Sequence, residues 1–255
     1  MKLTRLLTLL FLITFTVKAV AQQDTTDIDL KRTPYDLLSS YYSDNFHPFK
    51  KGNFYTGLAF SVADKKMTNT DYLVQKVIDG ERLNFDVLVK GGYYVGDYGM
   101  AMINVQYFQD KFDGIVFRDP DTLQSNSITR GFAVTPSFRS SVPLTPNERL
   151  SFFTEIGITF GNSYTLTRNT KNIDEIEKNY GNDFNFRIGL SPGVTFFAME
   201  NFAFEVQLDV IGYDLNVSKK RLNNGPESKE IRQNVDFNIN LLSLKLGLAY
   251  YFGAK

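Results

Sequence analysis

The chain has 255 residues, with 28 basic and 28 acidic side chains, one His, no Cys and no Trp. A net charge of zero argues against a nucleic-acid-binding protein, which needs an excess of basic residues. The lack of Cys excludes disulfide scaffolds and thiol nucleophiles, and a single His leaves little from which to build a metal site. We therefore expect no metal, no cofactor and no nucleic-acid partner.

Residues 1–21 have the three parts of a cleaved export signal. Lys2 and Arg5 give a basic start, residues 6–17 form an apolar run, and the small residues of 19–21 suit a cleavage site. The apolar run is too short to span a bilayer as a helix. The sequence thus predicts a signal peptide over 1–21 and export of the chain that follows.

Residues 22–51 form a polar leader before the first regular pattern. Thr33 followed by Pro34 is typical of a helix start, because proline is tolerated at the first helical position. The leader either closes the mouth of the domain behind it or docks a partner, or it is a poorly ordered segment. The sequence leaves these alternatives open. The only His of the chain, His47, lies in this leader.

Eight later stretches alternate apolar and polar residues, as half-buried strands do. In the second, Leu83, Phe85 and Val87 lie on one face, and Asn84 and Asp86 lie on the other. A slip of phase in the last stretch, near 241–242, predicts a β-bulge. The stretches are 52–63, 82–95, 99–109, 127–143, 149–161, 183–198, 202–214 and 235–252.

The connections between these stretches alternate between long and short. An even-stranded membrane barrel has this rhythm, with short turns on one side, longer loops on the other and both chain ends on the side of the short turns. We expect a short helix after Thr70 in the first long connection. A soluble eight-stranded barrel of the lipocalin kind alternates in the same way, so periodicity alone does not separate the two.

Aromatic residues favour the membrane barrel, because two aromatic bands flanking an aliphatic belt are typical of the two membrane interfaces. The expected lower band is Phe54, Tyr55, Tyr93, Tyr94, Phe152, Phe153, Phe196, Phe197, Phe202, Tyr250, Tyr251 and Phe252. The expected upper band is Tyr107, Phe108, Phe160, Phe184, Tyr213 and Phe237. We therefore predict an all-β chain: an eight-stranded antiparallel up-and-down transmembrane β-barrel over 52–252, followed by a tail over 253–255.

Four short segments resemble the small outer-membrane β-barrel proteins of Gram-negative bacteria, the OmpA/OmpX-like eight-stranded barrels. They are Ala21-Gln22, Leu150-Ser151-Phe152-Phe153-Thr154-Glu155-Ile156-Gly157, Gly189-Leu190-Ser191-Pro192-Gly193-Val194 and Leu248-Ala249-Tyr250-Tyr251-Phe252. The resemblance implies a bacterial outer membrane with both barrel ends in the periplasm. It implies no single activity, because structural, transport and secretion-associated barrels share it. Two departures are the residues after Phe252 and the prolines Pro136 and Pro192 inside strands.

The interior of an eight-stranded barrel is just wide enough for side chains to fill it. Strand parity turns four acids and four bases inward: Asp86, Lys90, Arg139, Glu155, Arg187, Glu205, Asp209 and Lys245. Asp86, Arg187 and Asp209 are expected to form a higher layer and the other five a lower one. Since buried charges must be paired, the preferred interpretation is a salt-bridge network that plugs the lumen. A gated ion path is the alternative.

The sequence predicts a non-enzymatic protein. Barrel enzymes that resemble lipid A deacylases or palmitoyltransferases use a His near the outer rim, whereas His47 precedes the first strand. Basic residues near the outer rim suggest contacts to lipopolysaccharide phosphates, with a solvated charged surface as the alternative. These basic residues are Arg130, Lys219, Lys220 and Arg221.

The predicted function is therefore that of an integral outer-membrane barrel, either structural or a subunit of an envelope or secretion assembly. Its surroundings would be outer-membrane lipid and lipopolysaccharide, and a protein partner would bind residues 22–51 or the external loops. Two alternatives remain: a narrow channel or small-solute transporter, and an outer-leaflet lipid-modifying enzyme.

Overall fold

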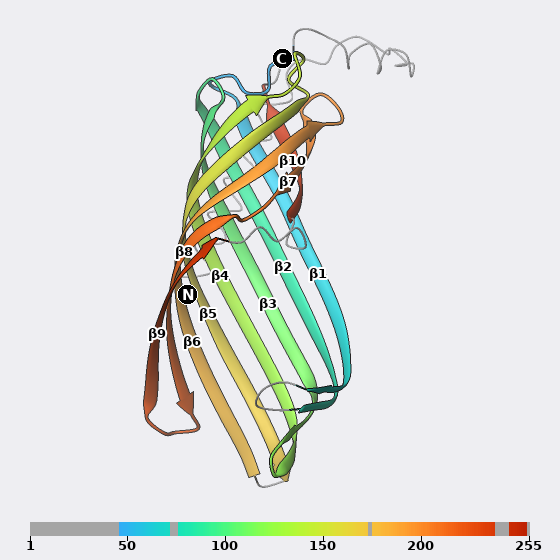
Figure 1. Cartoon of the computed structure of the whole chain (residues 1–255), viewed down its shortest axis with the longest axis vertical. Helices are drawn as coiled ribbons and strands as arrows, with labels where there is room; N and C mark the ends of the chain where they lie inside the picture. The colour runs from blue at the N-terminus through green and yellow to red at the C-terminus, as the bar shows by residue number, and fades with distance from the viewer. Residues whose placement is uncertain (1–45, 72–75, 173–174, 238–244, 254–255) are drawn as a thin grey trace, which may run out of the picture. The chain divides into compact units, whose positions relative to one another are not determined.

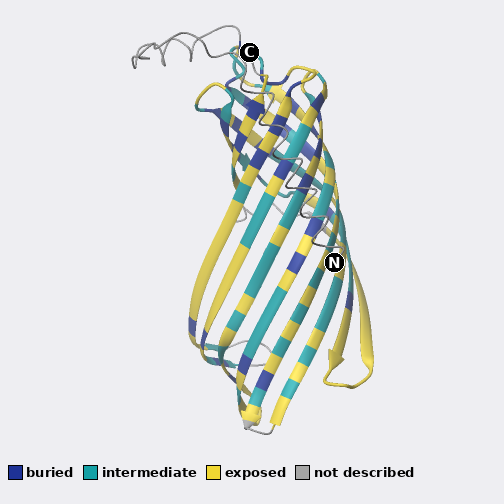
Figure 2. Ribbon diagram, turned by 180° about the vertical axis from the view of Figure 1, so that it is seen from behind, coloured by how far each residue is buried: buried dark blue, intermediate teal, exposed yellow. Residues whose placement is uncertain are grey.

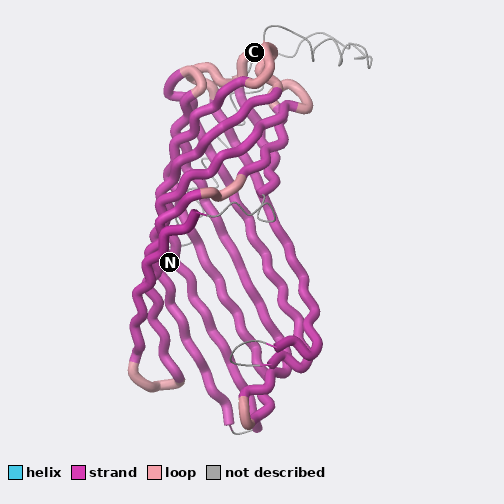
Figure 3. The backbone as a smooth tube through the Cα atoms, in the orientation of Figure 1, coloured by secondary structure: helices cyan, strands magenta, loops and turns pink. Residues whose placement is uncertain are grey.

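The computed structural model describes residues 46–71, 76–172, 175–237 and 245–253. The predicted signal peptide, the leader up to residue 45 and the expected bulge near 241–242 lie outside the described residues. The described chain consists of antiparallel strands joined by turns (Figure 1; Figure 3). Within these ranges no helix is long and apolar enough to cross a membrane.

The described residues form ten strands in one sheet. They are β1 (Phe54–Asp71), β2 (Lys76–Gly96), β3 (Gly99–Arg118), β4 (Asp121–Pro143), β5 (Leu150–Asn172), β6 (Glu175–Phe197), β7 (Phe202–Gln207), β8 (Ile211–Leu222), β9 (Glu227–Phe237) and β10 (Lys245–Phe252). Their order is β5-β4-β3-β2-β1-β10-β7-β6-β8-β9, and β5 also pairs with β6. The sheet therefore closes on itself as a barrel.

The ten strands make eight passes along the barrel. β7 pairs with residues 193–197 of β6 and β8 with residues 179–190 of the same strand, so β7 and β8 are two halves of one pass. β9 and β10 flank residues 238–244 and occupy the eighth pass. The predicted all-β, antiparallel barrel is confirmed. Its closing ladder joins residues 54–58 of β1 to β10, and beyond this the described part of β1 pairs only with β2.

A proline coincides with the break between β7 and β8. Pro192 has no N–H to donate to a ladder, and the register against β6 shifts by one residue between Leu190↔Ile211 and Gly193↔Gln207. In the break, the Leu208 N–H donates to the Pro192 carbonyl at 3.0 Å. Between these two pairs, the stretch from Gln207 to Ile211 therefore has one residue more than the facing stretch of β6. Such an extra residue reverses which alternate side chains point inward.

The strands continue far beyond the ends that the sequence predicts. Thr70 pairs with Val77 in the β1–β2 ladder, so the expected helix after Thr70 is wrong for the described residues, and so are the long external loops. The extensions mix polar and apolar residues on both faces, with Met67, Val77 and Val116 buried together inside, so no consistent alternation results. Cross-strand hydroxyl pairs stabilise them instead, as between Thr129 and Thr165 at 2.8 Å.

Large apolar side chains cover the outer surface of the barrel. Phe60 is 68% exposed and Leu246 is 69% exposed, while buried residues gather inside the end where β1 begins and β10 finishes (Figure 2). A lipocalin would have the reverse arrangement, with its apolar face inside. An exposed apolar belt around a filled interior is stable in hydrocarbon, so the fold is that of a membrane-spanning barrel.

Candidate functional site

The aromatic residues of the expected lower band divide between the two faces of the barrel wall. Phe54, Tyr93 and Phe252 are exposed on the outside, whereas their neighbours Tyr55 and Tyr251 are buried inside. Consecutive residues of a strand point to opposite faces, so each aromatic pair supplies both faces. The predicted lower band is therefore correct for its exposed members and wrong for the rings that fill the lumen, which are Tyr55, Tyr94, Phe153, Phe197 and Tyr251.

The end of the leader enters this end of the barrel. Phe49 is 1% exposed, and its ring lies 5.9 Å from that of Tyr251. The Asn53 amide donates to the carbonyls of His47 and Pro48, both at 3.1 Å, and so fixes the path of the segment. We call the resulting group the mouth cluster. It consists of Phe46, Phe49, Tyr55, Tyr94, Met100, Met102, Phe197, Ala203, Ala249 and Tyr251.

A second contact holds the leader to the turn between β4 and β5. His47 Nδ1 lies 3.6 Å from Glu148 Oε1. The Tyr98 hydroxyl, in the β2–β3 turn, donates to the same Glu148 oxygen at 3.0 Å, and this hydrogen bond raises the pKa of Tyr98 above its usual value. The only His of the chain therefore lies at the end of the barrel that holds the mouth cluster.

A layer of four charged side chains lies directly beyond the mouth cluster. On β2, for example, Lys90 lies four residues from Tyr94 on the same inward face, and both are buried. The layer consists of Lys90, Arg139, Glu155 and Glu205, and we call it the charge layer. Two bases and two acids make it neutral.

Arg139 is the centre of the charge layer and is fully buried. Its guanidinium donates to Glu205 Oε1 at 2.7 Å and to Glu155 Oε2 at 3.1 Å. The same group lies 4.0 Å from the centre of the Phe153 ring and 4.9 Å from that of Tyr55, which are cation–π distances. One cation thus joins two carboxylates from different strands across the lumen.

Neutral side chains complete the hydrogen bonding of both carboxylates. Glu155 Oε1 accepts from Asn104 at 2.7 Å and from Ser137 at 2.9 Å. Glu205 accepts from the hydroxyls of Tyr55 at 2.8 Å and Tyr251 at 2.9 Å. Because these two tyrosines belong to the mouth cluster, the aromatic and charged layers form one connected seal.

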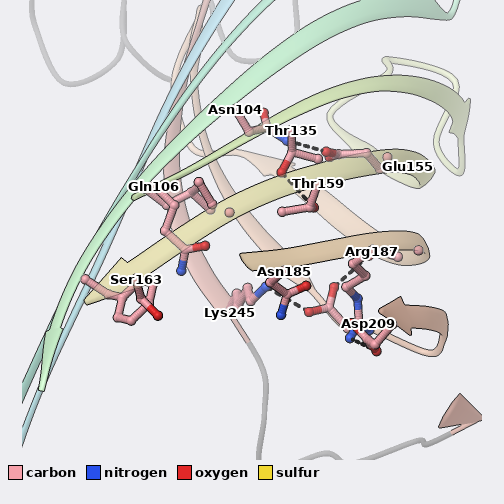
Figure 4. A pocket seen from close by; sticks show the side chains of 18 of the residues that line it. Asn104, Gln106, Thr135, Glu155, Thr159, Ser163, Asn185, Arg187, Asp209 and Lys245 are labelled. Atoms are coloured by element: carbon pink, nitrogen blue, oxygen red, sulfur yellow. Dashed lines mark hydrogen bonds and ion pairs between the residues drawn. The ribbon is translucent and has the colours of Figure 1, made fainter. Parts of the chain in front are cut away.

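A polar cavity of about 380 Å³ occupies the lumen beyond the charge layer (Figure 4). Hydroxyl and amide side chains make up much of its wall, including Thr135, Thr159 and Asn185. Lys90 and Glu155 of the charge layer also line it. The seal therefore separates this cavity from the end of the barrel that holds the mouth cluster.

Two ion pairs lie in the cavity wall. Arg187 donates to Asp214 at 2.9 Å, and Lys245 donates to Asp209 at 2.8 Å. Lys245 was expected in the lower layer, and this expectation is wrong. It lies six residues before Tyr251 on β10, whereas Lys90 lies only four residues from Tyr94 on β2, so Lys245 reaches the higher level.

The structure thus brings Lys90, Arg139, Glu155 and Glu205 into direct contact. Asp86 lies apart from them and accepts a hydrogen bond from Gln106. Sequence reasoning missed the neutral partners of the carboxylates and one acid of the cavity: Tyr55, Asn104, Ser137, Gln207, Asp214 and Tyr251. Among the described residues, no group of three or more His, Cys, Asp or Glu side chains is arranged to hold a metal ion.

The remaining predicted residues lie outside the lumen. Arg130, Lys219, Lys220 and Arg221 line one groove near the end of the barrel remote from the mouth cluster. Arg130 comes from β4 and the other three from β8, so the fold gathers residues that are about ninety positions apart in the chain.

The belt and the filled lumen define a class of protein, the small membrane-spanning β-barrel. Solved structures with a similar arrangement include the outer membrane protein OprG from Pseudomonas aeruginosa, with a TM-score of 0.46 and 13% identity over 82% of this chain and 98% of that one. A major outer membrane protein from Thermus thermophilus gives 0.35 and 10% over 78% and 99%. Ail, the attachment invasion locus protein of Yersinia pestis, gives 0.32 and 13% over 79% and 99%.

No protein-family model and no curated protein matches the sequence. The predicted all-β antiparallel barrel is confirmed by the strand pairing itself.

Proposed function

We propose that this chain is an integral protein of a bacterial outer membrane whose lumen is sealed, and that it acts as a structural component or as a subunit of an envelope assembly. The observation that carries the proposal is the pair of stacked layers across the lumen. A solute would have to displace Arg139 from two carboxylates and then pass the packed rings around Phe49. Breaking such a buried network is costly, which supports a closed barrel.

In this proposal the end with the mouth cluster faces the periplasm, and the cavity lies toward the outside. Both Phe54, where β1 begins, and Phe252, where β10 finishes, belong to the same end. Barrels inserted from the periplasm keep both termini on that side. The described end of the leader, which contains Phe46 and Phe49, would then lie on the periplasmic side.

A partner would bind the leader where it emerges from the mouth cluster. Anchoring of the leader by buried rings gives a partner a fixed point of attachment. Affinity purification of a tagged chain from native outer membranes in mild detergent, followed by mass spectrometry, tests this. We expect a stoichiometric protein that is lost when residues 22–45 are deleted, with the barrel still folded. A barrel that purifies alone, or a partner that survives the deletion, would contradict binding through the leader.

The second candidate is a narrow channel, and the cavity is the observation that favours it. A polar volume of about 380 Å³ holds several water molecules, and only the seal separates it from the mouth. A channel would require both layers of the seal to move together.

An enzymatic role forms no part of our proposal. Unchanged lipid A after incubation with the purified protein is the expected result, and a modified lipid would contradict it.

A further inference from the structure

A second polar surface lies on the outside of the barrel, on the five neighbouring strands β4, β5, β6, β8 and β9. It is a groove of about 590 Å³, which we call the cationic groove. The charged residues in its lining are Arg130, Lys219, Lys220, Arg221 and Glu227. The ladder places Arg130 opposite Tyr164 and Asn182 opposite Lys219, so the cations form one surface across the strands.

The groove carries a net positive charge: strand alternation places Arg130, Lys219 and Arg221 on the outer face with the single carboxylate of Glu227, while the Lys220 side chain lies on the other face. Glu227 pairs with Lys219 at 3.2 Å. Arg130 donates to the neutral Gln109 amide at 3.0 Å, and Arg221 lies 5.2 Å from the centre of the Tyr180 ring. Among the residues that the structure describes, neither arginine forms an ion pair. Two guanidinium groups are therefore available to an anion.

Along the membrane normal, the groove lies at the edge of the apolar belt. Twelve residues separate Phe152, an exposed aromatic residue of the lower band, from Tyr164 on β5. This corresponds to about 40 Å along a strand and about 30 Å along the membrane normal at a tilt of ~40°. The apolar band of such barrels is ~25 Å tall, so the groove begins where hydrocarbon gives way to headgroups.

The other side of the barrel lacks this charge. A groove of about 470 Å³ on β1, β2 and β3 is lined by Lys66 and Lys111 together with four acids. The acids are Asp64, Asp79, Glu81 and Asp113. A positive surface is therefore a property of one sector of the wall and not of the whole outer end.

We propose that the cationic groove binds the phosphorylated headgroup of a glycolipid in the outer leaflet. Arginine pairs with phosphate through two parallel N–H donors, which suits Arg130 and Arg221. Tyr164 and Tyr180 offer hydroxyls at headgroup level, and Leu166 offers an apolar surface to the acyl chains. The inference rests on the outward orientation given in the proposed function.

Binding of lipid A to the purified barrel in phosphatidylcholine vesicles tests this inference. The groove variant is Arg130→Gln with Arg221→Gln, and the matched control is Lys66→Gln with Lys111→Gln, which removes two charges from the acidic groove. We expect binding about thirtyfold weaker for the groove variant and unchanged for the control. A similar loss in both variants would overturn the site, because net charge alone would then account for binding.

Competition separates a lipid site from a site for free phosphate. Lipid A should bind in the presence of millimolar inorganic phosphate, and lipid A without its phosphates should bind as weakly as the groove variant does. Displacement by inorganic phosphate, or equal binding of the dephosphorylated lipid, would overturn the proposal. No groove residue belongs to the seal, so a negative result here would leave the proposal of a closed lumen standing.

Discussion

Replacing Arg139 with methionine is expected to destabilise the folded barrel by about 3–5 kcal/mol, because two buried carboxylates lose the cation they share. Arg139 is fully buried and binds both Glu155 and Glu205. Methionine fills much of the same volume, so the loss measures the charge and not a cavity. Urea unfolding of the barrel refolded into lipid vesicles gives this difference directly.

Two further variants test whether the lost ion pairs cause the loss of stability in Arg139→Met. Arg139→Met combined with Glu205→Gln should recover part of the lost stability, since one uncompensated charge is removed with its partner. Arg187→Met is the matched control, because the Arg187 side chain is 32% exposed and, among the described residues, its ion pair is with Asp214. Its loss should be below about 1 kcal/mol. Equal losses for Arg139→Met and Arg187→Met would contradict a central role for Arg139.

Replacing Phe49 with alanine is expected to cost about 3 kcal/mol, because a large ring is removed from a fully packed site. Phe49 lies within ring-contact distance of Tyr94, Phe197 and Tyr251. The same unfolding experiment measures the effect. Leu144→Ala is the control at the same end of the barrel: Leu144 is 57% exposed, so it should change stability by about 0.5 kcal/mol or less. An equally small effect for Phe49→Ala would mean that the leader does not seal the mouth.

The membrane-embedded part of the barrel was predictable from sequence because its two faces differ so strongly. Leu83, Phe85 and Val87 face outward while Asn84 and Asp86 do not, and this contrast is visible as period two. The strand extensions beyond the predicted ends lack this contrast between an apolar outer face and a polar inner face. Thr129 and Thr165 pair through hydroxyls on the inner face, while the outer face of β4 changes from Ile128 to Arg130. Such a ladder leaves no periodic signal and was interpreted as loop.

The site was predictable as a set of charges but not as a set of contacts. Strand parity alone turns Arg139, Glu155 and Glu205 inward, and they meet. Asp214 was missed because the register shift beside Pro192 reverses the parity of β8 relative to β7. Tyr251 was assigned to the membrane interface by residue type, although its parity places it inside with Ala249.

The insertion of the leader had no signal in local sequence. Phe46 and Phe49 lie in an irregular segment without alternation, and only the closed barrel creates the space that they fill. The expectation that the leader closes the mouth was one of three alternatives. The contact between Phe46 and Phe197, whose ring centres are 4.9 Å apart, depends on residues about 150 positions apart, and local pattern carries no information at that distance.

Ion conductance across a planar bilayer tests the closed lumen most directly. We expect a silent wild-type barrel and stepwise currents from the variant Phe49→Gly with Arg139→Gly, which opens both layers and shows that inserted protein is detectable. Heat-modified migration of both proteins verifies that they are folded. Stepwise currents from the wild-type barrel under the same conditions would contradict the seal and favour the narrow channel.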